Sequence, residues 1–306
     1  MAYETQSMSI PVAPSGRANR RAALFRESLP GMAERWALGF AWALMPSRIA
    51  GVPNLLRLYA RELLAPDYAL PDPEHALNSP PGLAGIVHDF TAPTLLAAYR
   101  RGLYPLAHIG PLKWWSPPTR SLLFFDELHI AKRLRRQMRH EQYTVTFDRD
   151  FEGVIAGCAG HRAKRWHLTW ITPKIMRAYA ELFDAGHAHS FEVWNERGEL
   201  AGGGYGVAIG SSFMTESQFS REPNTSKIGF TVLHWHLAHW GFAFNDGKLM
   251  TPTCRDMGFR EIPRAEFLAR LRDAQRSPGR PGRWQVETDA MAAANWQPRQ
   301  PSAALL

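Results

Sequence analysis

Residues 213–229, FMTESQFSREPNTSKIG, join an alternating apolar run to a polar loop and a second apolar run. The alternation predicts a β-strand, and the run after the loop predicts a helix. A phosphate-binding loop in front of a helix is usually rich in glycine, because its backbone N–H groups must approach the anion. No glycine lies between Ser220 and Ile228. The expected strand and helix are therefore joined by a loop that lacks the usual phosphate cradle.

The flanking sequence extends this unit into a mixed sheet. Capping residues, turn glycines and periodicity predict further helices at 91–105, 128–140, 149–159, 172–186, 226–242 and 264–274. Strands are expected at 143–148, 190–195, 199–209, 211–219, 248–251 and 259–262. This order is similar to that of the N-acetyltransferase-like (GNAT) fold. We expect an α/β (α+β) protein, in which a small N-terminal domain precedes a GNAT-like mixed-sheet domain.

The boundaries follow from composition. Residues 1–85 are expected to form a partly helical N-terminal extension that ends in a proline-rich linker at 65–82. Residues 86–127 would form the small domain and 128–275 the catalytic domain, and 276–306 would be a loose tail. The apolar stretch 36–45 is too short to span a membrane. It fits either a membrane surface or packing on the protein body, and we favour packing.

Composition limits the functional classes. The 306-residue chain has a formal net charge of +8, which favours polyanionic partners such as nucleic acid or anionic lipid. Its two cysteines, Cys158 and Cys254, are too few for a disulfide framework and indicate a reducing cytoplasm. His234, His236 and His239 are unsuitably spaced for a shared metal, so no metal site is expected.

Several stretches, in the right order, resemble leucyl/phenylalanyl-tRNA–protein transferases. They are AYRRGLYP (98–105), WWSP (114–117), LHIAKRLRR (128–136), FEGVIAGCA (151–159), TWIT (169–172), AYAELFDAGHAHSFEVW (178–194), LAGGGYGVAIGSSFMTESQFSREPNTSK (200–227) and GFREIPRAEFL (258–268). The resemblance covers about residues 88–272.

The resemblance implies a cytoplasmic N-end-rule enzyme that moves leucine, phenylalanine or methionine from aminoacyl-tRNA to the α-amine of proteins beginning with arginine or lysine. It implies no cofactor, because aminoacyl-tRNA takes the place of acetyl-CoA; we also expect a monomer without a membrane span. The chemistry is consistent with this expectation. An activated ester needs only a positioned, deprotonated amine and a stabilised oxyanion.

The resemblance also implies site residues. Glu216 would lie at the active site, although it could instead be a carboxylate paired with Arg221 or Lys227. Aromatic residues would line the pocket for the donor side chain or stack on its adenine, with core packing as the alternative. The substrate-binding residues expected around the donor are Trp114, Trp115, Trp170, Phe213, Ser217 and Ser220.

A second set of residues is basic. A solvated basic face is the simple explanation, but the density of cations favours contacts with tRNA phosphates. The expected tRNA-binding residues are Lys132, Arg133, Arg135, Arg136, Arg139, Arg165 and Lys227.

The sequence departs from the family at one place. Family members usually carry Leu-Ile-Asp-x-Gln, and with a strand at 248–251 the Asp and Gln fall on Thr251 and Thr253, with about four residues missing before the next glycine. Asp246 or Asp256 could take the place of the Asp only if the backbone moves. Three outcomes follow: a working transferase whose donor ribose hydroxyl carries the proton, a paralogue with another donor or acceptor, or an inactive tRNA-binding protein. A CoA-dependent acyltransferase is a further alternative, but it requires the missing phosphate cradle.

Overall fold

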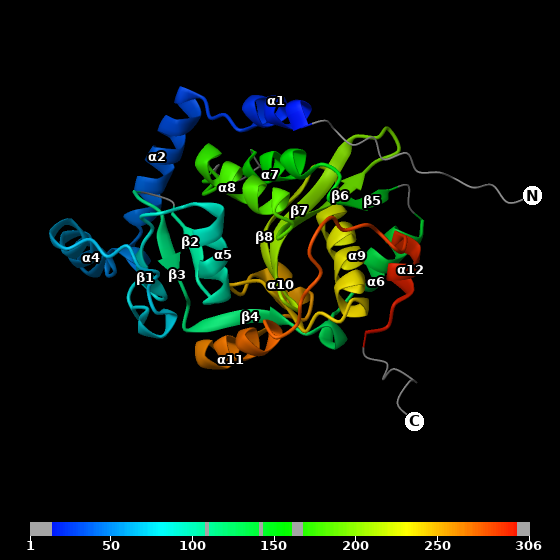
Figure 1. Cartoon of the computed structure of the whole chain (residues 1–306). Coiled ribbons are helices and arrows are strands. Elements are labelled where there is room, and N and C mark those ends of the chain that lie inside the picture. Colours follow the sequence, from blue (N-terminus) through cyan, green and yellow to red (C-terminus); the bar gives the residue numbers. More distant parts are fainter. Residues whose placement is uncertain (1–13, 108–109, 141–142, 161–167, 299–306) are drawn as a thin grey trace, which may run out of the picture.

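The computed structural model describes residues 14–107, 110–140, 143–160 and 168–298. A seven-stranded sheet runs through the larger part of the molecule in the order β10-β4-β9-β8-β7-β6-β5 (Figure 1). The pairing of β8 with β9 is parallel, and the other pairings are antiparallel. The strands are β4 (Thr119–Leu123), β5 (Thr144–Phe147), β6 (Ala188–Trp194), β7 (Leu200–Ile209), β8 (Ser212–Ser220), β9 (Phe244–Asp246) and β10 (Arg260–Pro263).

Helices cover both faces of this sheet. On one face α7 (Phe151–Ala159) and α8 (Pro173–Asp184) lie over β6 and β7, and on the other α9 (Thr225–His239) packs on the same strands. The close approach of α9 depends on Gly202, where a Cβ atom would collide with the Thr225 side chain. Further elements of this part are η2 (Phe125–Glu127), α6 (Lys132–Arg139), α10 (Pro252–Asp256), α11 (Arg264–Ala274) and α12 (Ala290–Asn295).

A smaller three-stranded sheet, with the order β1-β3-β2, precedes the main sheet in the chain. Its strands are β1 (Leu83–Ile86), β2 (Tyr104–Leu106) and β3 (Lys113–Trp115), and α5 (Ala92–Arg100) connects β1 to β2. The predicted domain boundary at 127 assigned β4 to this small domain. The structure instead pairs β4 with β9 and β10 of the main sheet.

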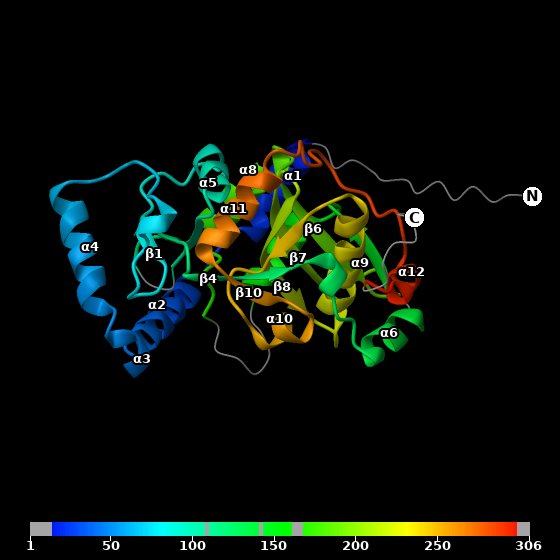
Figure 2. The ribbon, with the colours of Figure 1, turned by 90° about the horizontal axis from the view of Figure 1, so that it is seen from below.

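The N-terminal extension is helical. It contains α1 (Pro14–Leu24), α2 (Leu29–Ala43), α3 (Pro46–Ile49), α4 (Val52–Leu64) and the short 3-10 helix η1 (Pro73–His75). Helices α2 to α4 project at the end of the molecule opposite α6 and α12 (Figures 1 and 2). No helix in the described part of the chain combines the length and apolarity needed to cross a bilayer.

The segment after residue 276, predicted to be a loose tail, is packed against the body as far as it is described. Trp284 is 1% exposed, and its ring stacks on the ring of His189 with centroids 3.6 Å apart. The backbone N–H of Trp284 donates to Asp148 Oδ2 at 2.7 Å. Helix α12 packs against α6 and α9. The prediction was wrong because one large aromatic side chain outweighs the surrounding prolines and glycines.

We expect Trp284→Ala to lower the free energy of unfolding by about 3–5 kcal/mol, because it leaves a cavity among packed aromatic rings. Urea unfolding followed by far-UV circular dichroism measures the change. The matched control is Trp36→Ala, since Trp36 is partly exposed on α2. An equal, small effect of both substitutions would contradict a structural role for Trp284.

Candidate active site

The site is built around Glu216, which lies at an irregularity in β8. Tyr205 of β7 pairs with Ser217, and the next residue, Gly206, pairs with Thr215, so Glu216 has no partner across the strands. Such a β-bulge redirects a side chain. It directs Glu216 towards α5 and α8, where its side chain is only 1% exposed.

Three polar groups surround the Glu216 carboxylate. The Tyr99 hydroxyl of α5 donates to Oε1 at 2.5 Å, and the Tyr179 hydroxyl of α8 donates to Oε2 at 3.0 Å. The two tyrosine hydroxyl oxygens are themselves 2.5 Å apart. The Lys248 ammonium lies 2.5 Å from Oε1. The carboxylate is thus held from α5, α8 and the segment after β9.

Lys248 is also fixed by several contacts of its own. Its backbone has a φ of 64°, a left-handed conformation that is uncommon for a residue with a side chain. Its N–H donates to Asp246 Oδ1 at 2.8 Å, and its Nζ donates to the Thr215 carbonyl oxygen at 2.8 Å. Nζ also lies 5.4 Å from the centre of the Tyr104 ring, a cation–π distance.

Asp246 is fixed by a second, fully buried ion pair. The guanidinium of Arg120, on β4, meets the Asp246 carboxylate through two nitrogens, and one of the contacts is 3.2 Å. Arg120 Nη1 also donates to the Gly102 carbonyl oxygen at 3.0 Å. Fully buried charges are stable only when paired and hydrogen-bonded, as both of these are. The site therefore contains two neighbouring carboxylate–cation pairs.

Burial shifts the proton affinities of these groups. Burial, together with the Glu216 charge, raises the pKa values of Tyr99 and Tyr179 well above the ordinary value, so both stay protonated as donors. Burial lowers the pKa of Lys248, and the Glu216 charge opposes that change. The charge of Lys248 therefore depends on its carboxylate partner.

The predicted strand at 248–251 is wrong, because the strand lies at Phe244–Asp246. Asp246-Gly247-Lys248 therefore occupies the place expected for Asp-x-Gln, and lysine replaces glutamine. Thr251 and Thr253 are both exposed, Thr253 on α10 and Thr251 as its N-cap, where the Thr251 hydroxyl accepts the Cys254 N–H at 3.1 Å. Their substrate-binding role stays a prediction.

The predicted aromatic residues separate into two groups. Trp170 lies edge-on to Tyr179, with ring centroids 6.4 Å apart, and is half-buried beside the Glu216 site. Trp114 is buried in the adjoining core, and the half-buried Trp115 donates from its indole to the Leu106 carbonyl oxygen. Phe213 instead packs near Trp284 in the core on the opposite face of the sheet. Phe213 and Glu216 are three residues apart on β8, so the ordinary alternation of a strand already places their side chains on opposite faces.

The two predicted serines also differ. Ser217 is half-buried next to Glu216 on β8. Ser220 lies at the end of β8, where its hydroxyl oxygen accepts the Ser226 N–H at 3.0 Å and donates to the Ser226 hydroxyl. Ser220 thus binds the N-terminus of α9 and is not among the groups around Glu216. The half-buried Lys227 lies on the first turn of the same helix.

The cations predicted to bind tRNA are only partly free. Arg135 donates to the carbonyl oxygens of Ala294 and Trp296, and Arg139 donates to Asn295. These two arginines therefore fix the C-terminal segment. The other cations on α6, Lys132, Arg133 and Arg136, are exposed. Arg165 lies outside the described residues.

The three clustered histidines have separate partners. His234 Nε2 accepts the Asn245 amide at 2.7 Å, His236 Nε2 accepts the Glu287 N–H, and His239 stacks on Trp235. Among the described residues, no group of three or more histidine, cysteine, aspartate or glutamate side chains could hold a metal ion.

Sequence reasoning missed Tyr99, Tyr179, Arg120 and Lys248, and it offered Asp246 only as a substitute that requires the backbone to move. Tyr99 and Tyr179 lie in two of the stretches that resemble the transferases, AYRRGLYP and AYAELFDAG, which is the signal that could have drawn attention to them. Their convergence on Glu216 depends on the packing of α5 against α8, which no local pattern reveals.

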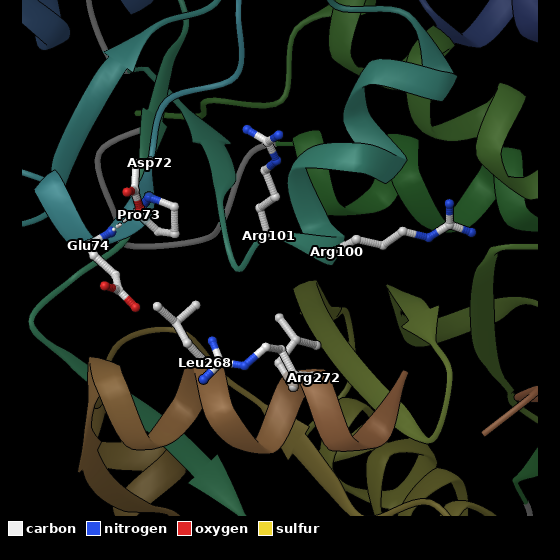
Figure 3. A pocket seen from close by; sticks show the side chains of 8 residues that line it. Asp72, Pro73, Glu74, Arg100, Arg101, Leu268 and Arg272 are labelled. Atoms are coloured by element: carbon white, nitrogen blue, oxygen red, sulfur yellow. Dashed lines mark hydrogen bonds between the residues drawn. The ribbon is translucent and has the colours of Figure 1, made fainter. Parts of the chain in front are cut away.

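A separate cavity of about 430 Å³ lies between the end of α5 and α11 (Figure 3). The linker contributes one wall through Asp72, Pro73 and Glu74, and Leu268 and Arg272 of α11 form another. None of the predicted site residues lines this cavity. The linker is therefore packed on the body at this point.

Comparison with known proteins identifies the family of the chain. Residues 122–272 match the family model "Leucyl/phenylalanyl-tRNA protein transferase", and residues 88–118 match the model of its N-terminal domain. A relative named leucyl/phenylalanyl-tRNA–protein transferase from Stutzerimonas stutzeri is 47% identical over 206 residues, 67% of this chain and 90% of the relative. The protein of the same name from Alkalilimnicola ehrlichii is 40% identical over 236 residues, 77% of this chain and 91% of the relative. The chain therefore belongs to the leucyl/phenylalanyl-tRNA protein transferase family of aminoacyltransferases.

Proposed function

We propose that this protein transfers leucine, phenylalanine or methionine from aminoacyl-tRNA to the N-terminal α-amine of proteins that begin with arginine or lysine. The observation that carries the proposal is the Glu216 carboxylate, held on a bulged strand by Tyr99, Tyr179 and Lys248. Family membership and the names of the relatives support the choice of substrates.

The reaction is an aminolysis. The α-amine nitrogen of the acceptor forms a bond to the ester carbonyl carbon, the bond from that carbon to the ribose oxygen breaks, and a proton passes from the amine to the ribose oxygen. Negative charge develops on the carbonyl oxygen, and a preorganised donor stabilises it. We assign this role to the Lys248 ammonium and assign Glu216 and the two tyrosines to holding that ammonium charged and in place.

The proposal includes the type of catalytic domain and the cellular compartment. We infer a GNAT-like catalytic domain that takes aminoacyl-tRNA where related folds take acetyl-CoA, in the cytoplasm where charged tRNA is present. The N-terminus of α9 supports this, because the Ser226 N–H that would face a pyrophosphate is already bonded to Ser220. A cradle of free N–H groups would be needed for CoA.

One observation favours a second candidate, a transferase with a different acceptor. Lysine in place of glutamine balances the charge of the site, since Glu216 and Asp246 now face Lys248 and Arg120. A cationic acceptor residue would enter a neutral site. A panel of peptides that begin with arginine, lysine, leucine or aspartate distinguishes the two candidates by their relative kcat/KM values.

We expect Glu216→Gln to lower kcat/KM by about 10²-fold, because it removes the charge that keeps Lys248 protonated. The assay follows labelled leucine and phenylalanine from their tRNAs to a peptide that begins with arginine. Glu196→Gln, on an exposed turn, is the control. An active Glu216→Gln enzyme would contradict the proposed role of the pair.

The pH dependence tests Lys248 directly. Burial lowers its pKa below the ordinary 10.5, so its charge is present at low pH and is lost earlier than usual as the pH rises. We expect wild-type kcat/KM to fall at alkaline pH relative to Lys248→Gln, whose neutral amide does not titrate. Lys248→Met should be poorly active at every pH. Parallel wild-type and Lys248→Gln profiles would exclude the lysine as the donor.

The exposed cations of α6 should carry part of the tRNA affinity. We expect a variant with glutamine at Lys132, Arg133 and Arg136 to bind tRNA more weakly, with a slope of log K against log salt concentration reduced by about 2–3. Filter binding over a salt series measures both quantities. Arg197→Gln, an exposed cation on another surface, should leave the slope unchanged. An unchanged slope for the triple variant would place the tRNA elsewhere.

A further inference from the structure

The two family models match residues 88–118 and 122–272, so the N-terminal extension lies outside both matches. It also holds most of the exposed apolar surface. In the described part of the chain, every exposed large hydrophobic side chain except Leu77, Leu249 and Met291 lies between residues 24 and 68. Such a concentration marks an interaction site rather than scattered surface residues.

The extension is built onto the body at both ends. At its start, Arg21 bridges Glu152 of α7 and Asp184 of α8, at 2.9 and 2.6 Å, and Phe25 is buried in the main core. At its end, Leu58 of α4 is buried, and the Glu62 carboxylate of α4 lies 2.9 Å from the Nε2 atom of His88 in the small domain. Helices α2 to α4 are therefore held in place while they project from one end of the molecule (Figure 2).

An apolar stripe runs along the exposed side of α2. Its largest members follow a spacing of three or four residues, which aligns side chains on one helical face. Leu29 is 77% exposed, Phe40 54% and Leu44 65%. The apolar stripe, as defined here, consists of Leu29, Met32, Trp36, Phe40 and Leu44. Leu56, Leu63 and Leu64 add exposed apolar groups on α4.

Positive charge accompanies the apolar stripe. The segment from α2 to α4, residues 29–64, contains four arginines and two glutamates, without lysine or aspartate. In the described part of the chain, no acidic side chain forms an ion pair with Arg26, Arg48 or Arg57, and all three are exposed. Arg48 lies over the Trp42 ring, with its guanidinium carbon 3.5 Å from the ring centre.

We propose that α2 to α4 bind the surface of a lipid bilayer that contains anionic lipids. The apolar stripe enters the boundary between headgroups and acyl chains, where Trp36 suits the interface, and the unpaired arginines contact lipid phosphates. tRNA would use the arginines but would leave the apolar stripe in water. A second copy of the chain would bury the stripe but would bring like charges together.

Vesicle flotation of the full chain tests the proposal, with vesicles of phosphatidylcholine alone and vesicles with about one third phosphatidylglycerol. We expect binding to the anionic vesicles that weakens with added salt. Trp36→Ser combined with Phe40→Ser should lower the partition coefficient about tenfold or more, and so should Arg48→Gln combined with Arg57→Gln. The matched control, Leu77→Ser combined with Met291→Ser, replaces exposed apolar residues elsewhere and should bind like wild type.

The insertion depth of Trp36 is measured with vesicles that contain bromine-labelled lipid. The bromine should quench part of the tryptophan fluorescence of the wild type, and this quenched part should be missing in Trp36→Phe. Equal binding to neutral and anionic vesicles would overturn the anionic preference. No vesicle binding, together with concentration-dependent association in sedimentation that the Trp36 and Phe40 substitutions abolish, would show that a second copy covers the stripe and would overturn the proposal. Loss of flotation in the control variant to the same extent would also overturn it. Transferase activity is not the readout, so failure here leaves the proposed reaction untouched.

Discussion

The ion pair between Lys248 and Glu216 is the constraint around which the centre of the molecule is arranged. Removing two charges from water is costly, and their attraction compensates only when the remaining hydrogen-bonding capacity is also used. Here both tyrosine hydroxyls and the Thr215 carbonyl oxygen use it. The pair is therefore stable only if α5, α8, β8 and the segment after β9 all adopt their observed positions.

The second ion pair connects this centre to the small sheet. Arg120 on β4 binds Asp246 on β9, and it also binds the Gly102 carbonyl oxygen between α5 and β2. Asp246 in turn accepts the backbone N–H of Lys248. A shift of the small sheet relative to the main sheet would therefore be transmitted to the Lys248 ammonium. The junction between the two sheets is therefore part of the geometry that fixes the Lys248–Glu216 pair.

The sequence predicts most of the main elements, because their periodicity and caps are local properties. Helix α11 at 264–274 and strand β7 at 200–209 lie where their patterns placed them, to within a residue. Strand β9 was not predicted, because two of its three residues are polar. Asn245 and Asp246 are nevertheless fully buried, and their partners, Thr215, His234 and Arg120, come from distant parts of the chain. The assignment of the family's Asp and Gln to Thr251 and Thr253 followed from the misplaced strand.

The packing of Trp284 has a consequence for biosynthesis. This ring completes the core between His189, Phe213 and Trp240, yet it leaves the ribosome only after every strand of the main sheet. The helices and strands before it can assemble during translation. Until residue 284 emerges, however, that core stays open and His189 lacks its stacking partner. A ribosome that stalls after α11 but before residue 284 emerges would hold a protein whose main sheet is formed but whose core is still open, and exposed core of this kind is what chaperones and proteases recognise.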